Sequence, residues 1–210
     1  GLLFLRFKTS STRYVIAFAS GVVLSAAFFE LIPESNIAQN YVFLGLGFFT
    51  FYLIEKAVML HSCGEKECEA HQIGWIAVFG MASDNIVDGM GIAAGYLTDP
   101  ALGLLITIAV VVHEIPQGIT SALLMKGSGF GFNKIIFVLG VMGAMYPVGA
   151  ALSGVVPSVW YGAIVAFVAG DFIYIGAGDL LAEAHIKFNT KVVLSVLLGG
   201  ISVPLLDLLI

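Results

Sequence analysis

Charge is scarce in this sequence. Asp, Glu, Lys and Arg make up only 11% of the 210 residues, whereas 59% are hydrophobic, and a soluble domain carries about 25% charged residues. This scarcity excludes an ordinary soluble domain and indicates a membrane protein. The net charge of −5 gives no reason to expect a nucleic acid or an anionic surface as partner. Because no linker or low-complexity segment marks a boundary, we expect a single transmembrane domain over residues 1–210.

Long hydrophobic runs dominate what is there. A helix needs roughly 20 apolar residues to cross a bilayer, and we expect such helices at 14–33, 40–58, 74–97, 100–126, 133–156, 158–183 and 190–210. The opening "GLLFL" is too short to span and indicates the tail of an earlier helix, which would give a complete parent eight spans. The sequence therefore predicts an all-α, polytopic transmembrane helical bundle with seven full spans.

Basic residues occur at alternate connections between these spans. Lys and Arg are enriched in cytoplasmic loops close to helix ends, whereas the connections "PESNIAQN" and "LTDPA" contain none. The basic residues are Arg6, Lys8, Arg13, Lys56, Lys66, Lys126, Lys134, Lys187 and Lys191. We therefore expect an integral protein of the plasma (inner) membrane, with the loop at 59–73 in the cytosol and the C-terminus outside.

Polar side chains share one depth near the middle of several spans. Ionisable groups at the bilayer centre cost several kcal/mol each unless they are paired, hydrated or bound to a metal. Two interpretations follow: an interhelical hydrogen-bond network, or a functional site, which so many groups at one depth favour. The residues are Asp84, Asn85, Asp88, His113, Glu114, Gln117, Tyr146 and Asp171.

Spacing narrows the chemistry of this group. In "SDNIVDGMG", Asp84 and Asp88 are four residues apart, and in "HEIPQG" His113 and Gln117 repeat that spacing, so each pair lies on one helix face. Carboxylates with one imidazole suit a divalent Zn, Mn or Fe ion. The sequence therefore predicts a metal site between the two motif helices.

Pro116 lies within the second motif. It cannot donate a backbone hydrogen bond to the carbonyl of Val112, so we expect a kink where the ligands lie. Broken helices at mid-membrane are where transporters bind substrate. The two motifs also run in opposite directions across the membrane, which hints at an inverted repeat.

Two other functions are compatible with parts of the pattern. "HEIPQ" begins like the H-E-x-x-H motif of a metalloprotease, but Gln117 occupies the position of the second histidine and a proline lies inside the motif. A metal-sensing membrane protein without transport also fits, and uptake of labelled metal into vesicles would separate it from a transporter.

The connection "HSCGEKECEAH" gathers further ligand types in the expected cytosolic loop at 59–73. Two thiols and two imidazoles can hold Zn²⁺, although the spacing fits no common zinc finger and a plain solvated loop is an equal alternative. The residues are His61, Cys63, Cys68 and His71.

Several stretches together resemble the ZIP (zinc/iron-regulated transporter-like) family. "ASGVVLSAAFFELIPES" is similar to the family's second helix, "DNIVDG" to its H-N-x-P-E-G motif, "HEIPQG" to its H/Q-x-I-P-E-G motif, and "AGDFIYIGAGDLLAEA" to its seventh helix. The resemblance implies eight helices in an inverted repeat, often as a homodimer. It also implies transport of divalent metal, Zn²⁺ first with Fe²⁺ or Mn²⁺ as alternatives, from outside into the cytosol.

Ligands carried over from the resemblance form two neighbouring metal positions. The first position would use Asp84, Asp88, His113 and Gln117, and the second Asn85, Asp88, Glu114 and Gln117. The chain departs from the family pattern where Asp84 replaces a histidine, Val87 a proline, Asp88 a glutamate and Gln117 a bridging glutamate. Asp171 adds a carboxylate where the family usually has a small polar residue.

Overall fold

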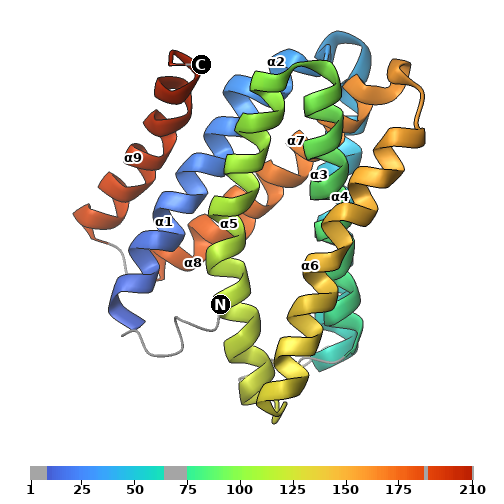
Figure 1. Cartoon of the computed structure of the whole chain (residues 1–210). Helices are drawn as coiled ribbons and strands as arrows, with labels where there is room; N and C mark the ends of the chain where they lie inside the picture. Colours follow the sequence, from blue (N-terminus) through green and yellow to red (C-terminus); the bar gives the residue numbers. More distant parts are fainter. Residues whose placement is uncertain (1–8, 64–74, 187–188, 210) are drawn as a thin grey trace.

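The computed structural model describes residues 9–63, 75–186 and 189–209, and every regular element in these ranges is a helix. Figure 1 shows a bundle whose long helices run up and down between two ends. The elements are α1 (Thr9–Ser25), η2 (Ala26–Leu31), α2 (Ile32–Glu34), α3 (Ile37–Cys63), α4 (Trp75–Thr98), α5 (Pro100–Gly127), α6 (Phe132–Val155), η3 (Ser158–Trp160), α7 (Tyr161–Ile173), η4 (Tyr174–Leu180), α8 (Leu181–His185) and α9 (Thr190–Asp207).

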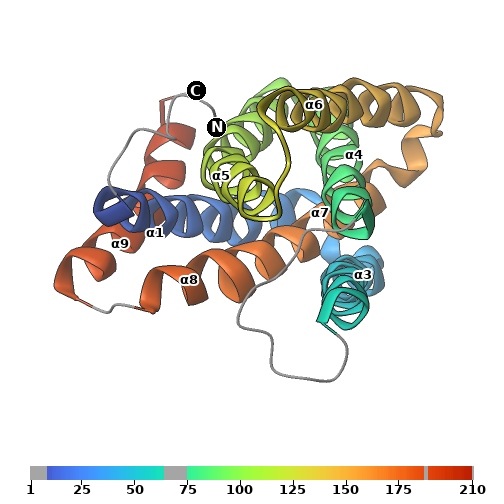
Figure 2. The ribbon, with the colours of Figure 1, turned by 90° about the horizontal axis from the view of Figure 1, so that it is seen from below.

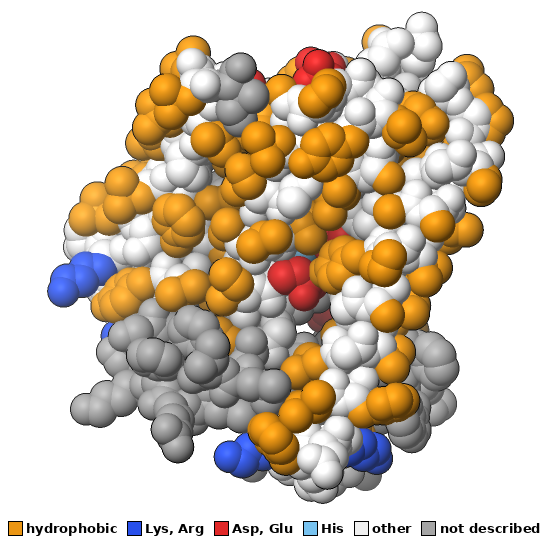
Figure 3. Space-filling model, in the orientation of Figure 1, with side chains coloured by type: hydrophobic (Ala, Val, Ile, Leu, Met, Phe, Trp, Pro, Cys, Tyr) orange, Lys and Arg blue, Asp and Glu red, His pale blue; other side chains and the backbone are white. Residues whose placement is uncertain are grey.

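Six stretches of the described chain are long and apolar enough to cross a membrane: Arg13–Glu34, Ile37–Ala57, Pro100–Gly127, Phe132–Val155, Ser158–His185 and Thr190–Asp207. Helix α4, with 24 residues, is comparable in length, but its aspartates and asparagine lower its mean hydropathy. The surface drawn in Figure 3 is largely hydrophobic, as a lipid-facing surface requires. The predicted all-α transmembrane bundle is therefore confirmed.

One predicted boundary is wrong. The second span was expected to end at 58, with a loop from 59 to 73, but α3 continues to Cys63, so residues 59–63 are helical. The sequence from 48 to 63 contains no glycine or proline that would end the helix. The truncated helix expected at the N-terminus falls on residues 1–8, outside the described residues.

Short turns connect several of the spans at the end where α3 and α5 begin. Asn36 adopts a positive φ of 51° between α2 and α3, a conformation that asparagine tolerates better than most residues. Asp99 separates α4 from α5, and its Oδ1 accepts hydrogen bonds from the backbone N–H groups of Ala101 and Leu102 at 2.8 and 3.2 Å. Pro100 follows at the first helical position, where its missing N–H costs nothing.

The described lysines and arginines lie toward the opposite end of the bundle, where α1, α6 and α9 begin and where α3 and α5 end. On the face drawn in Figure 3, the upper end shows acidic side chains and no Lys or Arg. The described residues in this basic group are Arg13, Lys56, Lys126, Lys134 and Lys191. The two ends of the bundle therefore differ in charge.

Three pairs of parallel helices form the most extensive contacts: α4 with α6, α1 with α9, and α3 with α7. Each pair meets through glycines. A Cβ on Gly89 would collide with the carbonyl oxygen of Tyr146 in α6, and a Cβ on Gly149 would collide with the carbonyl oxygen of Ile86 in α4. Such mutual close approach of backbones is how membrane helices gain packing where lipid supplies no hydrophobic driving force.

Glycines of α1 and α7 make the same kind of contact with a parallel partner helix. Gly21 of α1 lies against the Val196 carbonyl of α9, and Gly170 of α7 lies against the Leu44 carbonyl of α3. The reciprocal contacts join Gly199 to the Phe18 carbonyl and Gly47 to the Phe167 carbonyl. Helices α1 and α7 therefore make matching contacts with their respective parallel partners.

Aligning Gly21 with Gly170 aligns the rest of both spans. "AFASG" before Gly21 matches "AFVAG" before Gly170, and "ELIPE" at 30–34 matches "DLLAE" at 179–183. Each span passes from an α-helix into a π-helical segment, η2 or η4, and then into a short α-helix. The two spans run in opposite directions (Figure 1), so they form an inverted repeat in this chain.

Pro116, where a kink is predicted, lies inside a continuous helix. Helix α5 is assigned as one uninterrupted helix from Pro100 to Gly127, since neighbouring groups can compensate for the single backbone bond that a proline removes in a membrane helix. The irregular segments are η2 and η4, on the spans that flank α5 and α4. Such π-helical segments are frequent near functional sites.

Candidate metal centre

Four side chains from α4 and α5 meet inside the bundle. Asp84 and Asp88 of α4 and His113 and Glu114 of α5 each offer one ligand atom, and these atoms lie within 4.8 Å of one another. The first three side chains are buried and Glu114 is partly exposed. The helical spacing predicted from the sequence therefore brings the two motifs together across one helix interface.

Direct contacts join the two helices within this cluster. Gln117 donates from Nε2 to Asp84 Oδ2 at 2.8 Å, and His113 Nε2 lies 3.3 Å from Asp88 Oδ2. The two polar residues of α4, one turn apart, therefore face the two polar residues of α5. Asp84 lies opposite Gln117, and Asp88 lies opposite His113.

The backbone of α5 fixes the orientation of His113. Its Nδ1 lies 3.1 Å from the carbonyl oxygen of Ala109, and in the Nδ1–H tautomer it donates to that oxygen. Phe172 of α7 contacts the imidazole edge to face, with ring centroids 5.5 Å apart. A second hydrogen bond of this kind sets which ring nitrogen binds a metal, so Nε2 is the nitrogen available to the cluster.

Many polar atoms around the cluster have no hydrogen-bond partner within the described protein. A buried polar atom of this kind costs free energy comparable to a lost hydrogen bond, and a buried charge costs more. They are Asp84 Oδ1, Asn85 Oδ1, both Asp88 oxygens, His113 Nε2, Glu114 Oε1, Tyr146 OH and both Asp171 oxygens; among them, His113 Nε2 and Asp88 Oδ2 are joined only by the 3.3 Å ion-pair contact. A divalent cation can satisfy such atoms, because carboxylate and imidazole are ligands for Zn, Fe and Mn.

The remaining predicted residues surround the four-residue cluster. Asp171 of α7 lies beside Asp84 and Asp88, and Tyr146 of α6 lies beside Glu114. Asn85 contacts α6, where its Nδ2 donates to the Met142 carbonyl at 2.9 Å, and its Oδ1 has no hydrogen-bond partner within the described protein. On the face drawn in Figure 3, acidic side chains are visible at mid-height within the hydrophobic surface.

The Cys/His connection was predicted as a further place for metal. His61 and Cys63 belong to the last turn of α3, and their side chains are outside the described residues, as are Cys68 and His71 entirely. Metal binding by this segment stays a prediction.

Phe172 was missed by the sequence interpretation. It is fully buried and holds the imidazole of His113, yet an aromatic residue among the many in membrane spans carries no distinguishing signal. Only the neighbouring Asp171 marks this turn of α7 as unusual.

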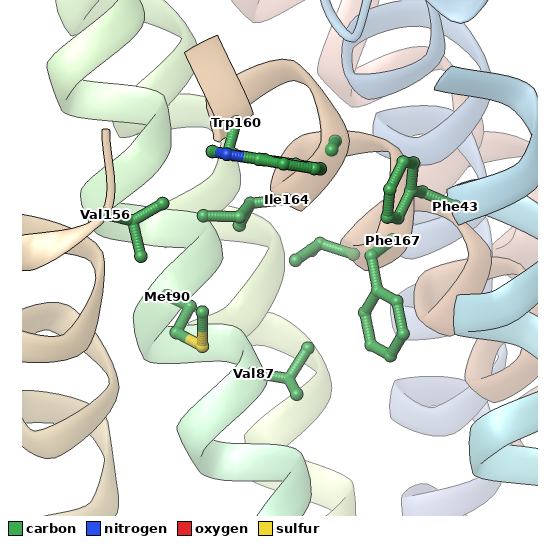
Figure 4. A pocket seen from close by; sticks show the side chains of 9 residues that line it. Phe43, Val87, Met90, Val156, Trp160, Ile164 and Phe167 are labelled. Atoms are coloured by element: carbon green, nitrogen blue, oxygen red, sulfur yellow. The ribbon is translucent and has the colours of Figure 1, made fainter. Parts of the chain in front are cut away.

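A cavity of about 380 Å³ lies between α3, α4, α6 and α7, close to the centre but separate from it. Figure 4 shows Trp160, Phe43 and Phe167 around it, with Met90 and Val87 of α4 on one wall. All nine side chains that line it are apolar. It therefore offers no ligand for a cation.

Sequence comparisons identify a family. The family model described as ZIP zinc transporter matches residues 60–206, which include both motif helices. Zinc transporter ZIP13 of Pongo abelii is 26% identical over 197 residues, covering 81% of this chain and 58% of that protein. ZIP13 of Mus musculus is 25% identical over 256 residues, covering 94% of this chain and 70% of that protein.

A more distant relative matches as well. Zinc transporter YKE4 of Saccharomyces cerevisiae is 24% identical over 147 residues, covering 58% of this chain and 42% of that protein. The chain spans about half the length of several curated relatives that it matches. The family match covers well over half of the chain and agrees with the motifs and the helical bundle. The chain therefore belongs to the ZIP zinc transporter family.

Proposed function

We propose that this chain carries a divalent transition metal, Zn²⁺ first, across the membrane through the centre between α4 and α5. The observation that carries the proposal is the cluster of Asp84, Asp88, His113 and Glu114, whose ligand atoms lie within 4.8 Å of one another. These groups lie in the middle of apolar helices, where a cation crossing the bilayer has the greatest need of ligands.

The ligand set supports a borderline metal. One imidazole with three carboxylates suits Zn²⁺, and Fe²⁺ and Mn²⁺ remain alternative substrates. The relatives named above are called zinc transporters, which favours Zn²⁺ as the first substrate to test.

The chain's own groups would replace the water around the ion. Asp84 and Asp88 present carboxylate oxygens from one face of α4, and His113 presents Nε2, held in place through its contacts with Ala109 and Phe172. The Gln117 amide, which donates to Asp84, orients that carboxylate. The ion would offset negative charge that the protein itself leaves without partners.

The charge difference between the two ends supports a direction. Lysines and arginines favour the cytosolic side, so we place the basic end in the cytosol, with the 59–73 segment there and the C-terminus outside, in the plasma (inner) membrane. The acidic end then faces the side from which metal enters, and transport runs from outside into the cytosol.

An enzyme is the function that the comparisons disfavour. The ZIP family is a family of transporters rather than enzymes, and Gln117 cannot act as the second metal histidine of an H-E-x-x-H protease. The intramembrane metalloprotease alternative is therefore not supported.

Uptake of zinc into vesicles tests the proposal. Purified protein in vesicles should take up ⁶⁵Zn²⁺, and Asp88→Asn should lower the metal affinity by at least the ~10- to 100-fold that follows loss of even an indirect ligand contact. Asp207→Asn is the matched control, since Asp207 is exposed at the end of α9. Uptake by the Asp88 variant at the parent rate would refute the centre, and tight binding by the parent without uptake would favour a metal sensor.

A further inference from the structure

Asp171 is a carboxylate that the four-residue cluster does not include. It is fully buried in α7, and neither of its oxygens has a hydrogen-bond partner within the described protein. Asp84 of α4 is within side-chain hydrogen-bond reach of Asp171 when one of the two carboxyl groups carries a proton, and Asp88 of α4 also acts on it. A third helix therefore brings a third carboxylate against the two aspartates of α4.

The face of α7 that carries Asp171 points at the centre. Val168, three residues earlier, contacts Gly91 of α4, and Phe172, the next residue, contacts His113 of α5. Asp171 is three residues after Val168, so the two residues are neighbours on one face of α7. The contact of Val168 with Gly91 therefore places Asp171 on the side of α7 that packs against α4.

The inverted repeat shows that the fold does not require an acid at this place. The residue that aligns with Asp171 in the other span is Val22, which follows Gly21 as Asp171 follows Gly170. Val22 is also buried and belongs to the main hydrophobic core. Valine therefore satisfies the same helix pairing, and the carboxylate of Asp171 needs another explanation.

No basic side chain explains it. The described lysines and arginines lie toward one end of the bundle, and the charged groups that act most strongly on Asp171 are the acids Asp84, Asp88 and Asp179. A buried carboxyl group among carboxylates either shares a proton with a neighbour or needs a cation to compensate its charge, and a divalent ion can displace such a proton.

We propose that Asp171 provides a second cation position, made of carboxylates alone and shared with Asp84 and Asp88, beside the position that contains His113. This inference rests on the proposed metal transport and deepens it. An all-oxygen position suits harder divalent ions such as Mn²⁺, whereas the imidazole position suits Zn²⁺. Asp171 thereby widens the range of ions that the centre holds and gives a moving ion its next ligands toward α7.

Metal binding to the purified full chain tests this assignment. Metal-free protein in detergent is equilibrated with Zn²⁺ alone or Mn²⁺ alone at constant neutral pH, and bound metal is counted by mass spectrometry. The variants are Asp171→Val, which copies the residue of the other repeat, and Asp171→Asn, which keeps the size of the side chain. Val22→Ala is the packing control, and His113→Ala removes the other position.

The expected results separate the two positions. The parent binds a second ion that both Asp171 variants lose, their affinity for Mn²⁺ falls by at least about tenfold, and their first Zn²⁺ is weakened by less than about threefold. His113→Ala shows the reverse pattern, and Val22→Ala resembles the parent. Size-exclusion profiles establish whether each variant is folded. If Asp171→Val does not fold, the test rests on Asp171→Asn.

Other results would overturn the assignment. If both Asp171 variants keep the second ion, or if they lose Zn²⁺ and Mn²⁺ by the same factor, Asp171 forms no separate position, while the proposed function stands as long as His113→Ala loses Zn²⁺. If the parent binds no ion, or if His113→Ala binds Zn²⁺ like the parent, the proposed function fails together with the second position.

Discussion

The spans built on α1 and α7 share one architecture and differ in chemistry at one buried place. Both meet a parallel partner through a glycine, and both continue through a π-helical segment into an acidic terminal turn. After the glycine, one span carries Val22 and the other Asp171. The comparison separates what the repeat needs for packing, which valine supplies, from what a metal centre needs, which is a carboxylate.

Exchanging these two residues should produce the largest effect. Val22→Asp places a carboxyl group in the hydrophobic core and should lower the free energy of unfolding by about 3 kcal/mol or more. Asp171→Val removes a buried acid without a partner and should leave the metal-free protein as stable as the parent or more so. Thermal unfolding in detergent without metal measures both. Equal destabilisation by the two changes would show that the positions are not structurally equivalent.

Adding a methyl group at Gly21 or Gly170 tests the helix packing that the two spans share. Gly21→Ala and Gly170→Ala should each lower the free energy of unfolding by about 1–3 kcal/mol, because each Cβ meets a backbone carbonyl of the partner helix. Gly140→Ala is the control, since open space surrounds Gly140 and alanine favours the helix. A large loss of stability at one glycine and none at the other would show that the two spans do not pack in the same way.

Acid should weaken metal binding at the centre that Asp171 adjoins. A change at Val22, the matching residue of the other span, should not alter this pH dependence. Carboxylate and imidazole ligands must lose their protons to bind metal, so affinity should fall as the pH is lowered, by at least about tenfold between roughly pH 7.5 and 5.5, where an imidazole ordinarily titrates. Calorimetry with Zn²⁺ measures this, with Val22→Ala as a variant that should keep the parent profile. Affinity independent of pH would exclude ligation by these groups.

Hydropathy and spacing were enough to predict most of the bundle and the centre. The spans follow from apolar runs, and the four-residue spacing places Asp84 with Asp88 and His113 with Gln117 on single faces. Depth along a helix does not fix the direction in which a side chain points, so the sequence could not show that Asn85 faces α6. The end of α3 at Cys63 was missed because the position where a helix ends depends on local breakers rather than on membrane thickness.

The sequence offered only weak evidence for the inverted repeat. The two short motifs of α4 and α5 only hinted at it, whereas the spans of α1 and α7 carry the match. Their sequences share few identical residues, and the glycines become comparable only when the structure shows that each one touches the carbonyl of a parallel partner. Without that contact, the difference between Val22 and Asp171 has no meaning in the sequence.

The position of a bound zinc ion tests the central claim most directly. Crystals soaked in Zn²⁺ and measured at the zinc absorption edge should give an anomalous peak between α4 and α5, roughly 2.0–2.2 Å from His113 Nε2 and from carboxylate oxygens of Asp84 or Asp88. The peak should disappear in His113→Ala. A peak that persists unchanged in that variant, or zinc bound only elsewhere in the parent, would contradict the account and leave the polar cluster as a structural network.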